Sequence, residues 1–144
     1  MNDPFNLSRF IEAQRPILSR FMDELQAGHK TSHWMWYVFP QLKGLGSSET
    51  AMQFGINDLH EARAYLEHPV LGSRLVECVQ ALLKHRELSA LQILGSPDDL
   101  KLRSCLTLFN EAHPESALFQ QALDQFYSGK SDERTLQLLR ERMS

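Results

Sequence analysis

Apolar residues recur at helical spacing along almost the whole chain, and Pro or Gly residues separate the segments. One stripe follows Pro16 and stops at Gly28, and another follows Pro69. The residues predicted to face inward are Ile17, Leu18, Phe21, Met22, Leu25, Leu59, Ala62, Leu66, Leu71, Leu75, Cys78, Val79, Leu82, Leu102, Cys105, Leu106, Phe109, Ala112, Leu118, Phe119, Ala122, Leu123, Phe126, Leu136, Leu139 and Met143. No Asn-Gly or Asp-Gly pair indicates a hairpin. The pattern predicts an all-α fold, a single-domain irregular (orthogonal) bundle of six to eight short helices over residues 1–144.

Several helix starts carry capping signals. Ser89 followed by Gln92 is a capping-box pattern. Asn57, Ser96 and Ser131 each precede a predicted helix and are expected to cap it with their side chains.

Composition excludes several classes of protein. The chain has 144 residues, 42% of them hydrophobic and 23% charged, which is typical of one globular domain and not of a disordered or disulfide-dense chain. Fifteen basic against eighteen acidic residues give a net charge of −3. A binder of duplex nucleic acid that relies on bulk charge would be more basic, so this partner is not expected. Nothing in the composition identifies a protein partner.

The sequence predicts a cytoplasmic protein that does not enter a membrane. The first residues include Asp3 and lack the apolar stretch of a secretory signal. The charge-free run between Lys30 and Lys43 has twelve residues, short of the roughly 20 that a membrane helix needs. Cys78 and Cys105 lie in apolar-periodic segments and are expected to be buried free thiols.

One segment, residues 25–48, contains no acidic residue, and we call it the acid-free window. It contains both tryptophans, Trp34 and Trp36, together with two of the six histidines. In one interpretation the aromatic residues are core and the glycines form turns. In the other, the Gly-Leu-Gly-Ser-Ser loop leads into a helix near Glu49 whose N–H groups suit an anion, and an indole stacks on a ring. Lys30, His33, Lys43 and Ser48 would add donors. Both interpretations remain open.

Outside the acid-free window, the signs of a binding site are weaker. Arg74 and Tyr65 lie at the edges of apolar stripes, and Lys101, Ser104 and Thr107 form one row beside a buried stripe, so these residues could line a pocket. The alternatives are surface ion pairs and hydroxyl groups bonded to the preceding turn.

Histidine and cysteine chemistry has weaker support in the pattern. His68 precedes Pro69, which is typical of a local cap. His29 and His33 are too few to hold a metal, and no metal or cofactor is expected. The pair at residues 60–61 is expected on a solvated helix face, and a position inside a helix argues against Cys105 as a nucleophile.

The chain resembles a bacterial family of unknown function, number eighteen-ten in that series, along nearly its whole length. The distinctive run is residues 33–42 (HWMWYVFPQL) with 44–46 (GLG). Further matching segments are 3–5 (DPF), 61–66 (EARAYL), 68–72 (HPVLG), 74–75 (RL), 101–104 (KLRS) and 107–109 (TLF).

The resemblance implies a compact helical fold of bacterial origin, without an established activity or catalytic set. The family is often labelled calpastatin, but that inhibitor is a disordered repeat protein, whereas this chain has a core-forming composition and no repeats. More distantly, the helical make-up is similar to that of N-glycosidases linked to ADP-ribose chemistry. The family's motif residues fall on His33, Trp34, Trp36, Gln41, Ser48, Tyr65, His68, Arg74, Lys101 and Ser104.

The functional hypothesis is a pocket where the aromatic segment meets Arg74 and the helix of Lys101. It would bind an anionic, ring-bearing molecule such as a nucleotide or an ADP-ribose derivative. The predicted ligand-binding residues are Lys30, His33, Trp34, Trp36, Gln41, Ser48, Tyr65, His68, Arg74, Lys101 and Ser104. The alternative is a protein-interaction module without catalytic activity, and whether the protein is an enzyme stays open.

Overall fold

The computed structural model describes residues 3–143, with side chains to residue 142, and in this range helices are the regular elements. They are α1 (Ser8–Gln14), the 3-10 helix η1 (Arg15–Ile17), α2 (Leu18–Ala27), α3 (Met35–Val38), α4 (Glu49–Phe54), α5 (Leu59–Glu67), α6 (Leu71–Leu83), α7 (Ala90–Leu94), α8 (Asp98–Ala112), α9 (Leu118–Tyr127) and α10 (Glu133–Met143). Only an isolated bridge between Leu42 and Ile56 has β character in this range. The all-α prediction is confirmed. Within the described residues, seven α-helices have seven residues or more, and α3, α4 and α7 are shorter.

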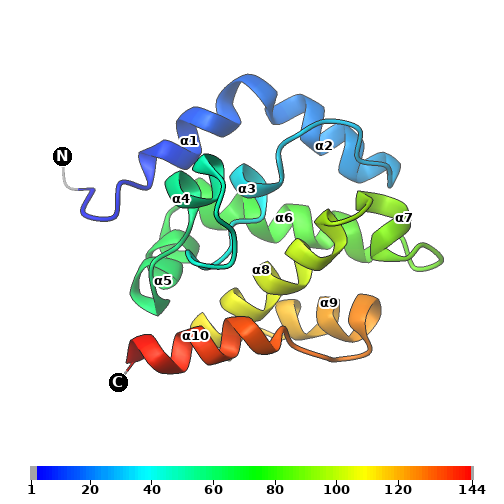
Figure 1. Cartoon of the computed structure of the whole chain (residues 1–144). Coiled ribbons are helices and arrows are strands. Elements are labelled where there is room, and N and C mark those ends of the chain that lie inside the picture. The colour runs from blue at the N-terminus through cyan, green and yellow to red at the C-terminus, as the bar shows by residue number, and fades with distance from the viewer. Residues whose placement is uncertain (1–2, 144) are drawn as a thin grey trace.

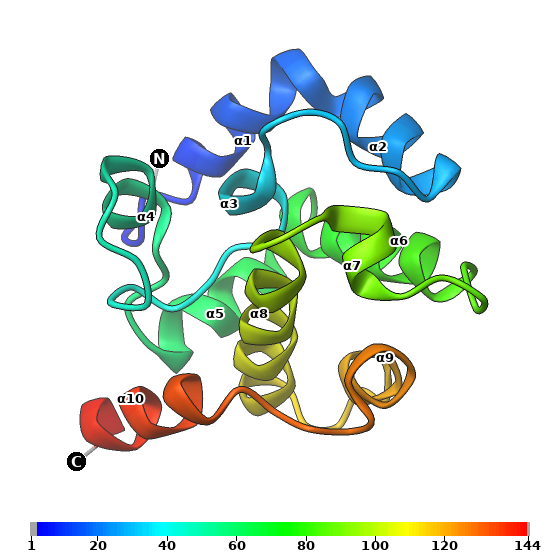
Figure 2. The same ribbon diagram turned by 45° about the vertical axis from the view of Figure 1, so that its right-hand side comes forward.

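Helix α8 runs through the middle of the bundle (Figures 1 and 2). It contacts α5, α7, α9 and α10, while α6 packs against α2, α5 and α9. Because neighbours surround α8, all of residues 104–109 are buried, a continuous run instead of one stripe. Ser104 and Thr107 tolerate this burial because their hydroxyls donate to the carbonyls of Leu100 and Arg103.

The predicted apolar stripes form the core. Most of their residues are buried, and Ile17, Leu18, Met22, Leu66, Leu118, Phe126 and Leu136 are half-buried at its edge. The side chain of Met143 lies outside the described residues. Cys78 and Cys105 are buried free thiols, as predicted. In the described part of the chain, no helix is both long and apolar enough to span a membrane.

The helix caps agree with the sequence only in part. The Ser89–Gln92 capping box is present. Asn57 does not cap α5: Asp58 does, by accepting from the Glu61 N–H at 3.0 Å, because the Asn57 side chain is engaged elsewhere.

The other two predicted caps are also wrong. Ser131 is one residue too early, and the carboxylate of Asp132 accepts from the N–H and hydroxyl of Thr135 instead. Ser96 provides no side-chain cap for α8, whose first N–H groups donate to the backbone carbonyls of Gly95 and Pro97.

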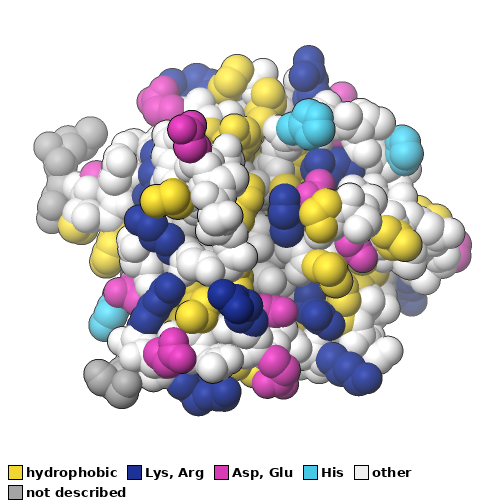
Figure 3. All heavy atoms as spheres, viewed as in Figure 1, with side chains coloured by type: hydrophobic (Ala, Val, Ile, Leu, Met, Phe, Trp, Pro, Cys, Tyr) yellow, Lys and Arg dark blue, Asp and Glu magenta, His cyan; other side chains and the backbone are white. Residues whose placement is uncertain are grey.

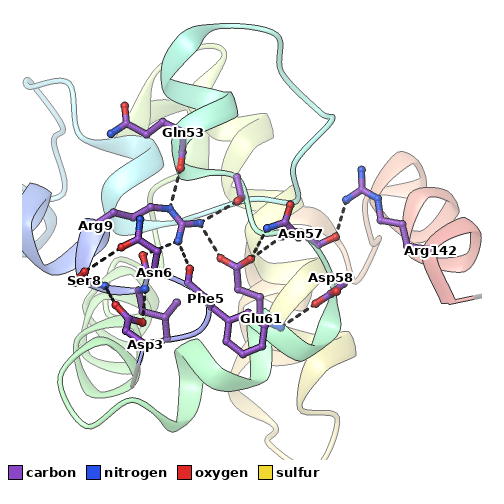
Figure 4. Close-up of polar contacts among 12 residues, drawn as sticks. Asp3, Phe5, Asn6, Ser8, Arg9, Gln53, Asn57, Asp58, Glu61 and Arg142 are labelled. Atoms are coloured by element: carbon purple, nitrogen blue, oxygen red, sulfur yellow. Dashed lines mark hydrogen bonds and ion pairs between the residues drawn. The ribbon is translucent and has the colours of Figure 1, made fainter. Parts of the chain in front are cut away.

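A buried ion pair fixes the chain between α4 and α5 (Figure 4). His60 is exposed as expected, but Glu61 has no exposed surface, which corrects the prediction of a solvated pair. Arg9 approaches Glu61 Oε2 at 2.8 Å, and Asn57 donates twice to Oε1. The remaining Arg9 donors reach the carbonyls of Phe5, Asn6, Gln53 and Gly55. Four Arg9 contacts therefore hold backbone carbonyls, and the fifth holds the Glu61 carboxylate.

Candidate ligand pocket

The acid-free window takes its negative charge from another segment. The Glu24 carboxylate of α2 accepts from the backbone N–H groups of Thr31 and Ser32, the Ser32 hydroxyl and the Trp34 indole N–H, at 2.7–3.0 Å. Burial raises the pKa of Glu24, but these hydrogen bonds outweigh it and hold the pKa at about 2. The loop that leads into α3 is therefore anchored by a carboxylate, so the surroundings of the acid-free window are not free of negative charge.

Trp34 belongs to the core. It is 1% exposed, and its ring lies 6.0 Å from that of Phe21 and 6.1 Å from that of Phe39. The core interpretation is correct for this indole. Trp36 is also buried, and the ideal position of a Cβ on Gly46 would lie 3.3 Å from its ring. Gly44, with φ of +108°, supplies the turn that the sequence predicts there.

Lys30 is a cation buried beside Trp34. Its side chain is 7% exposed, and its Nζ lies 2.8 Å from Asp98 Oδ2 and 2.5 Å from the carbonyl of Ser32. The same ammonium lies 5.0 Å from the centre of the Trp34 ring, a cation–π contact. This side chain thereby connects the acid-free window to the start of α8.

A cavity of about 260 Å³ opens at this junction. It lies between the loop before α3, α3 itself, the start of α4 and the first turn of α8. Its walls are formed by Lys30, His33, Trp34, Met35, Trp36, Tyr37, Ser48, Thr50, Asp98 and Lys101. Six predicted residues therefore converge: Lys30, His33, Trp34, Trp36, Ser48 and Lys101. The cavity wall also includes four residues that the sequence did not indicate, although the first two lie within the aromatic run: Met35, Tyr37, Thr50 and Asp98.

Two lysines and one carboxylate determine the charge of the cavity wall. Lys101 Nζ lies 3.4 Å from Asp98 Oδ1 and its side chain is one-third exposed, so it is less tightly paired than Lys30. His33 is exposed at the rim. The sum over Lys30, Lys101 and Asp98 is one positive charge. Across the face in Figure 3, by contrast, basic and acidic side chains are interspersed.

Two of the predicted site residues form a network away from the cavity. Tyr65 is fully buried and packs on Phe10, with ring centres 5.1 Å apart, and this burial raises its pKa. Arg74 donates to Gln14 Oε1 at 3.1 Å, and Gln14 Nε2 donates to the carbonyl of Tyr37 at 2.6 Å. Arg74 was expected in the pocket wall because its position flanks an apolar stripe, but its guanidinium is used to hold Gln14.

Three further predicted residues have local roles. His68 Nδ1 accepts from the N–H groups of Val70 and Leu71, which is the capping role considered for it. Ser104 bonds back within α8. Gln41 is buried, and its Nε2 has no hydrogen-bond partner. None of the three lines the cavity.

The start of α4 does not offer the anion site that the loop suggested. The helix begins at Glu49 as expected, but it has only six residues. Ser48 Oγ already accepts from the Ala51 N–H at 3.1 Å, and Glu49 places a carboxylate in the first turn. Ser48 is therefore a cap whose side chain also borders the cavity.

The thiols and histidines do not form a reactive site. Burial, assisted by the charge of Glu77, raises the pKa of Cys78 to about 12, and burial raises the pKa of Cys105 well above its ordinary value. His29 and His33 are both exposed. Within residues 3–142, no three His, Cys, Asp or Glu side chains gather as a metal ion would require.

These features define a single-domain, all-helical protein with a small polar cavity between α3 and the start of α8. The chain belongs to the family described as "Protein of unknown function (DUF1810)", which matches residues 4–139. This confirms the resemblance found in the sequence. The crystal structure of the conserved hypothetical protein Rv1873 from Mycobacterium tuberculosis is 48% identical, covers 96% of this chain and 99% of its own, and superimposes with a TM-score of 0.94. No curated protein matches the chain.

Proposed function

We propose that the protein binds a small anionic molecule that carries a ring, such as a nucleotide, in the cavity beside α3. The observation that carries this proposal is the convergence of Lys101 with the aromatic segment. A lysine from the first turn of α8, two indoles, a histidine and three hydroxyl-bearing residues line one space of about 260 Å³. Concave sites with a few converging polar groups are typical of small-molecule binding.

The shape of the site restricts the ligand. Phe21, Phe39 and the Lys30 ammonium pack around the Trp34 indole, so the ligand ring would contact Trp36 or Tyr37. The volume lies just below the usual range for small-molecule sites, about 300–1,000 Å³. A mononucleotide would fill the cavity, and a molecule as long as ADP-ribose would extend beyond it.

The alternative, an interaction module, has less support. It predicts no polar cavity beside Trp34, and it predicts a continuous exposed apolar patch. Among the described residues, the large hydrophobic side chains that are exposed are Met52 in α4, Val70 just before α6, and Leu91 and Leu100 in the adjoining helices α7 and α8. The cytoplasmic location remains a prediction from the sequence.

The proposal is tested by titrating AMP and ADP-ribose while tryptophan fluorescence and the melting temperature are measured. Both tryptophans line the cavity, so binding changes their emission. A ligand at 100 times its Kd stabilises the fold by about 2.7 kcal/mol, which raises Tm by several degrees. Lys101→Gln should weaken binding at least tenfold, whereas Lys84→Gln, at an exposed position that does not line the cavity, should leave it unchanged. The absence of any response at millimolar concentration to AMP, to ADP-ribose and to the singly charged nucleotides described below would reject the proposal.

A further inference from the structure

Lys30 is committed to contacts within the protein. An ammonium group has three N–H donors. Two of those of Lys30 are used by Asp98 Oδ2 at 2.8 Å and by the Ser32 carbonyl at 2.5 Å, and the ammonium lies 5.0 Å from the centre of the Trp34 ring. Its side chain is also nearly enclosed. The second cation of the cavity, Lys101, is therefore the lysine that can bind an incoming anion.

Asp98 lies beside that one available cation. Its Oδ1 is 3.4 Å from Lys101 Nζ, and its Oδ2 is bonded to Lys30. An anionic group that contacts Lys101 therefore comes within a few ångströms of the Asp98 carboxylate. One negative charge on the ligand is neutralised by Lys101, but a second negative charge would face Asp98 with no cation free to offset it.

We propose that the cavity selects ligands with a singly charged anionic group, a carboxylate or a phosphodiester, over phosphate dianions, and that Asp98 sets this selection. The inference rests on the proposed function and specifies its ligand class. Repulsion between an extra charge and a carboxylate at a partly buried site is large enough to lower affinity tenfold or more. Among nucleotides, cyclic and diester forms would be preferred to simple monophosphates.

A comparison of two ligands that share a base and a sugar tests this. At pH 7.5 AMP is largely a dianion, because the second pKa of a phosphate monoester is about 6, whereas 3′,5′-cyclic AMP carries one charge. The wild-type protein should bind cyclic AMP at least tenfold more tightly than AMP. In Asp98→Asn, AMP should bind about tenfold more tightly than in the wild type, and the preference should fall below about threefold. The isosteric amide keeps an oxygen for Lys30.

Asp99→Asn is the matched control, because it removes the same charge from the same turn of α8 at a residue that does not line the cavity. It should keep the wild-type preference. Circular dichroism verifies that the variants fold. A comparison of AMP with its 5′-methyl ester needs no variant, and the ester should bind the wild type about tenfold more tightly.

The outcomes separate the two proposals. If AMP and cyclic AMP both bind the wild type with equal affinity, or if Asp98→Asn keeps the preference, the selection by Asp98 is wrong while ligand binding stands. If neither the nucleotides nor the ester binds the wild type at millimolar concentration, both proposals are rejected.

Discussion

Glu61 keeps a charged carboxylate in the protein interior because both of its oxygens have donors. Arg9 serves one oxygen, and the backbone and side chain of Asn57 serve the other. Such a pair adds little stability compared with a well-packed apolar replacement, but the removal of one partner leaves the other charge buried and alone. The contribution of Glu61 is therefore seen most clearly when it is deleted.

Glu61→Ala should lower the free energy of unfolding by about 3–5 kcal/mol, because it leaves the Arg9 guanidinium enclosed without its carboxylate. Urea denaturation measures this change. Glu67→Ala, on the exposed side of the same helix, should stay within about 0.5 kcal/mol of the wild type. Equal effects of the two substitutions would show that the loss of the ion pair with Arg9 is not what destabilises Glu61→Ala.

The burial of Glu61 could not be predicted from local spacing. The residue lies four positions before Tyr65, at the edge of the buried face of α5, where either a solvated or a buried side chain fits the pattern. Its partner Arg9 lies 52 residues earlier in the chain. A charged residue at such a position is buried only when a distant partner exists, and one sequence does not reveal that partner.

The loop before α3 is held in place by one side chain of α2. Glu24 accepts four hydrogen bonds from residues 31–34, so the entry to the cavity depends on this carboxylate being ionised. Its pKa is about 2 in the folded protein against an ordinary value of 4.5. Because the folded pKa is the lower one, the contribution to stability is complete above about pH 4.5 and is lost as the pH falls towards 2.

Glu24→Gln should therefore reduce stability by a constant amount between pH 7 and about pH 5, and the difference from the wild type should shrink below pH 4.5. Urea denaturation followed by tryptophan fluorescence at a series of pH values measures it. Asp23→Asn, at an exposed neighbouring position, should show no comparable trend. A difference that grows on acidification would contradict the anchoring role.

At the scale of helices, the sequence predicts the apolar stripes better than it predicts the capping residues. The apolar stripes of α2, α6, α8 and α9 and the capping box of α7 are correct, because they depend on residues within one or two turns. The caps of α5 and α10 are displaced by one residue. Where two neighbouring residues, such as Asn and Asp or Ser and Asp, can each cap a helix, the local sequence does not choose between them. Tertiary contacts decide which one does.

The whole molecule shares one core that includes residues from both ends of the described chain. Phe10 of α1 and Leu139 of α10 belong to the same buried cluster as Trp34 and Phe109. Arg142 extends this connection, because it donates to the carbonyls of Asn57 and Lys43 in the segments on either side of α4. A single cooperative unfolding transition is the expected consequence.

Leu139→Ala should destabilise the protein by about 2–5 kcal/mol, since its side chain is buried between α10 and the rest of the core. The shift should be the same whether unfolding is followed by circular dichroism or by the fluorescence of the distant tryptophans. Leu136→Ala, at a half-buried position, should cost less. Two separate transitions would show that α10 unfolds independently.

Six of the eleven predicted ligand-binding residues line the cavity, and the site that they would form stays a prediction. Residues 30–48 lie close in sequence, so a pocket that uses one of them tends to include others, and Lys101 joins them through the first turn of α8. Tyr65, Arg74 and Ser104 also flank apolar stripes, but that position fits a core contact as well as a pocket wall. Asp98 lies in the first turn of α8, where an acidic residue suits the helix dipole, and its role in the cavity depends on Lys30, which no local pattern connects to it.

The two thiols, Cys78 on α6 and Cys105 on α8, are both buried inside the bundle. A modifying reagent can attack them only while α6 or α8 is exposed by a breathing motion of the fold. The rate at which such a reagent modifies Cys78 and Cys105 therefore reports how often the interior opens under native conditions. Thiol modification thus measures how often the folded state opens, without any added label.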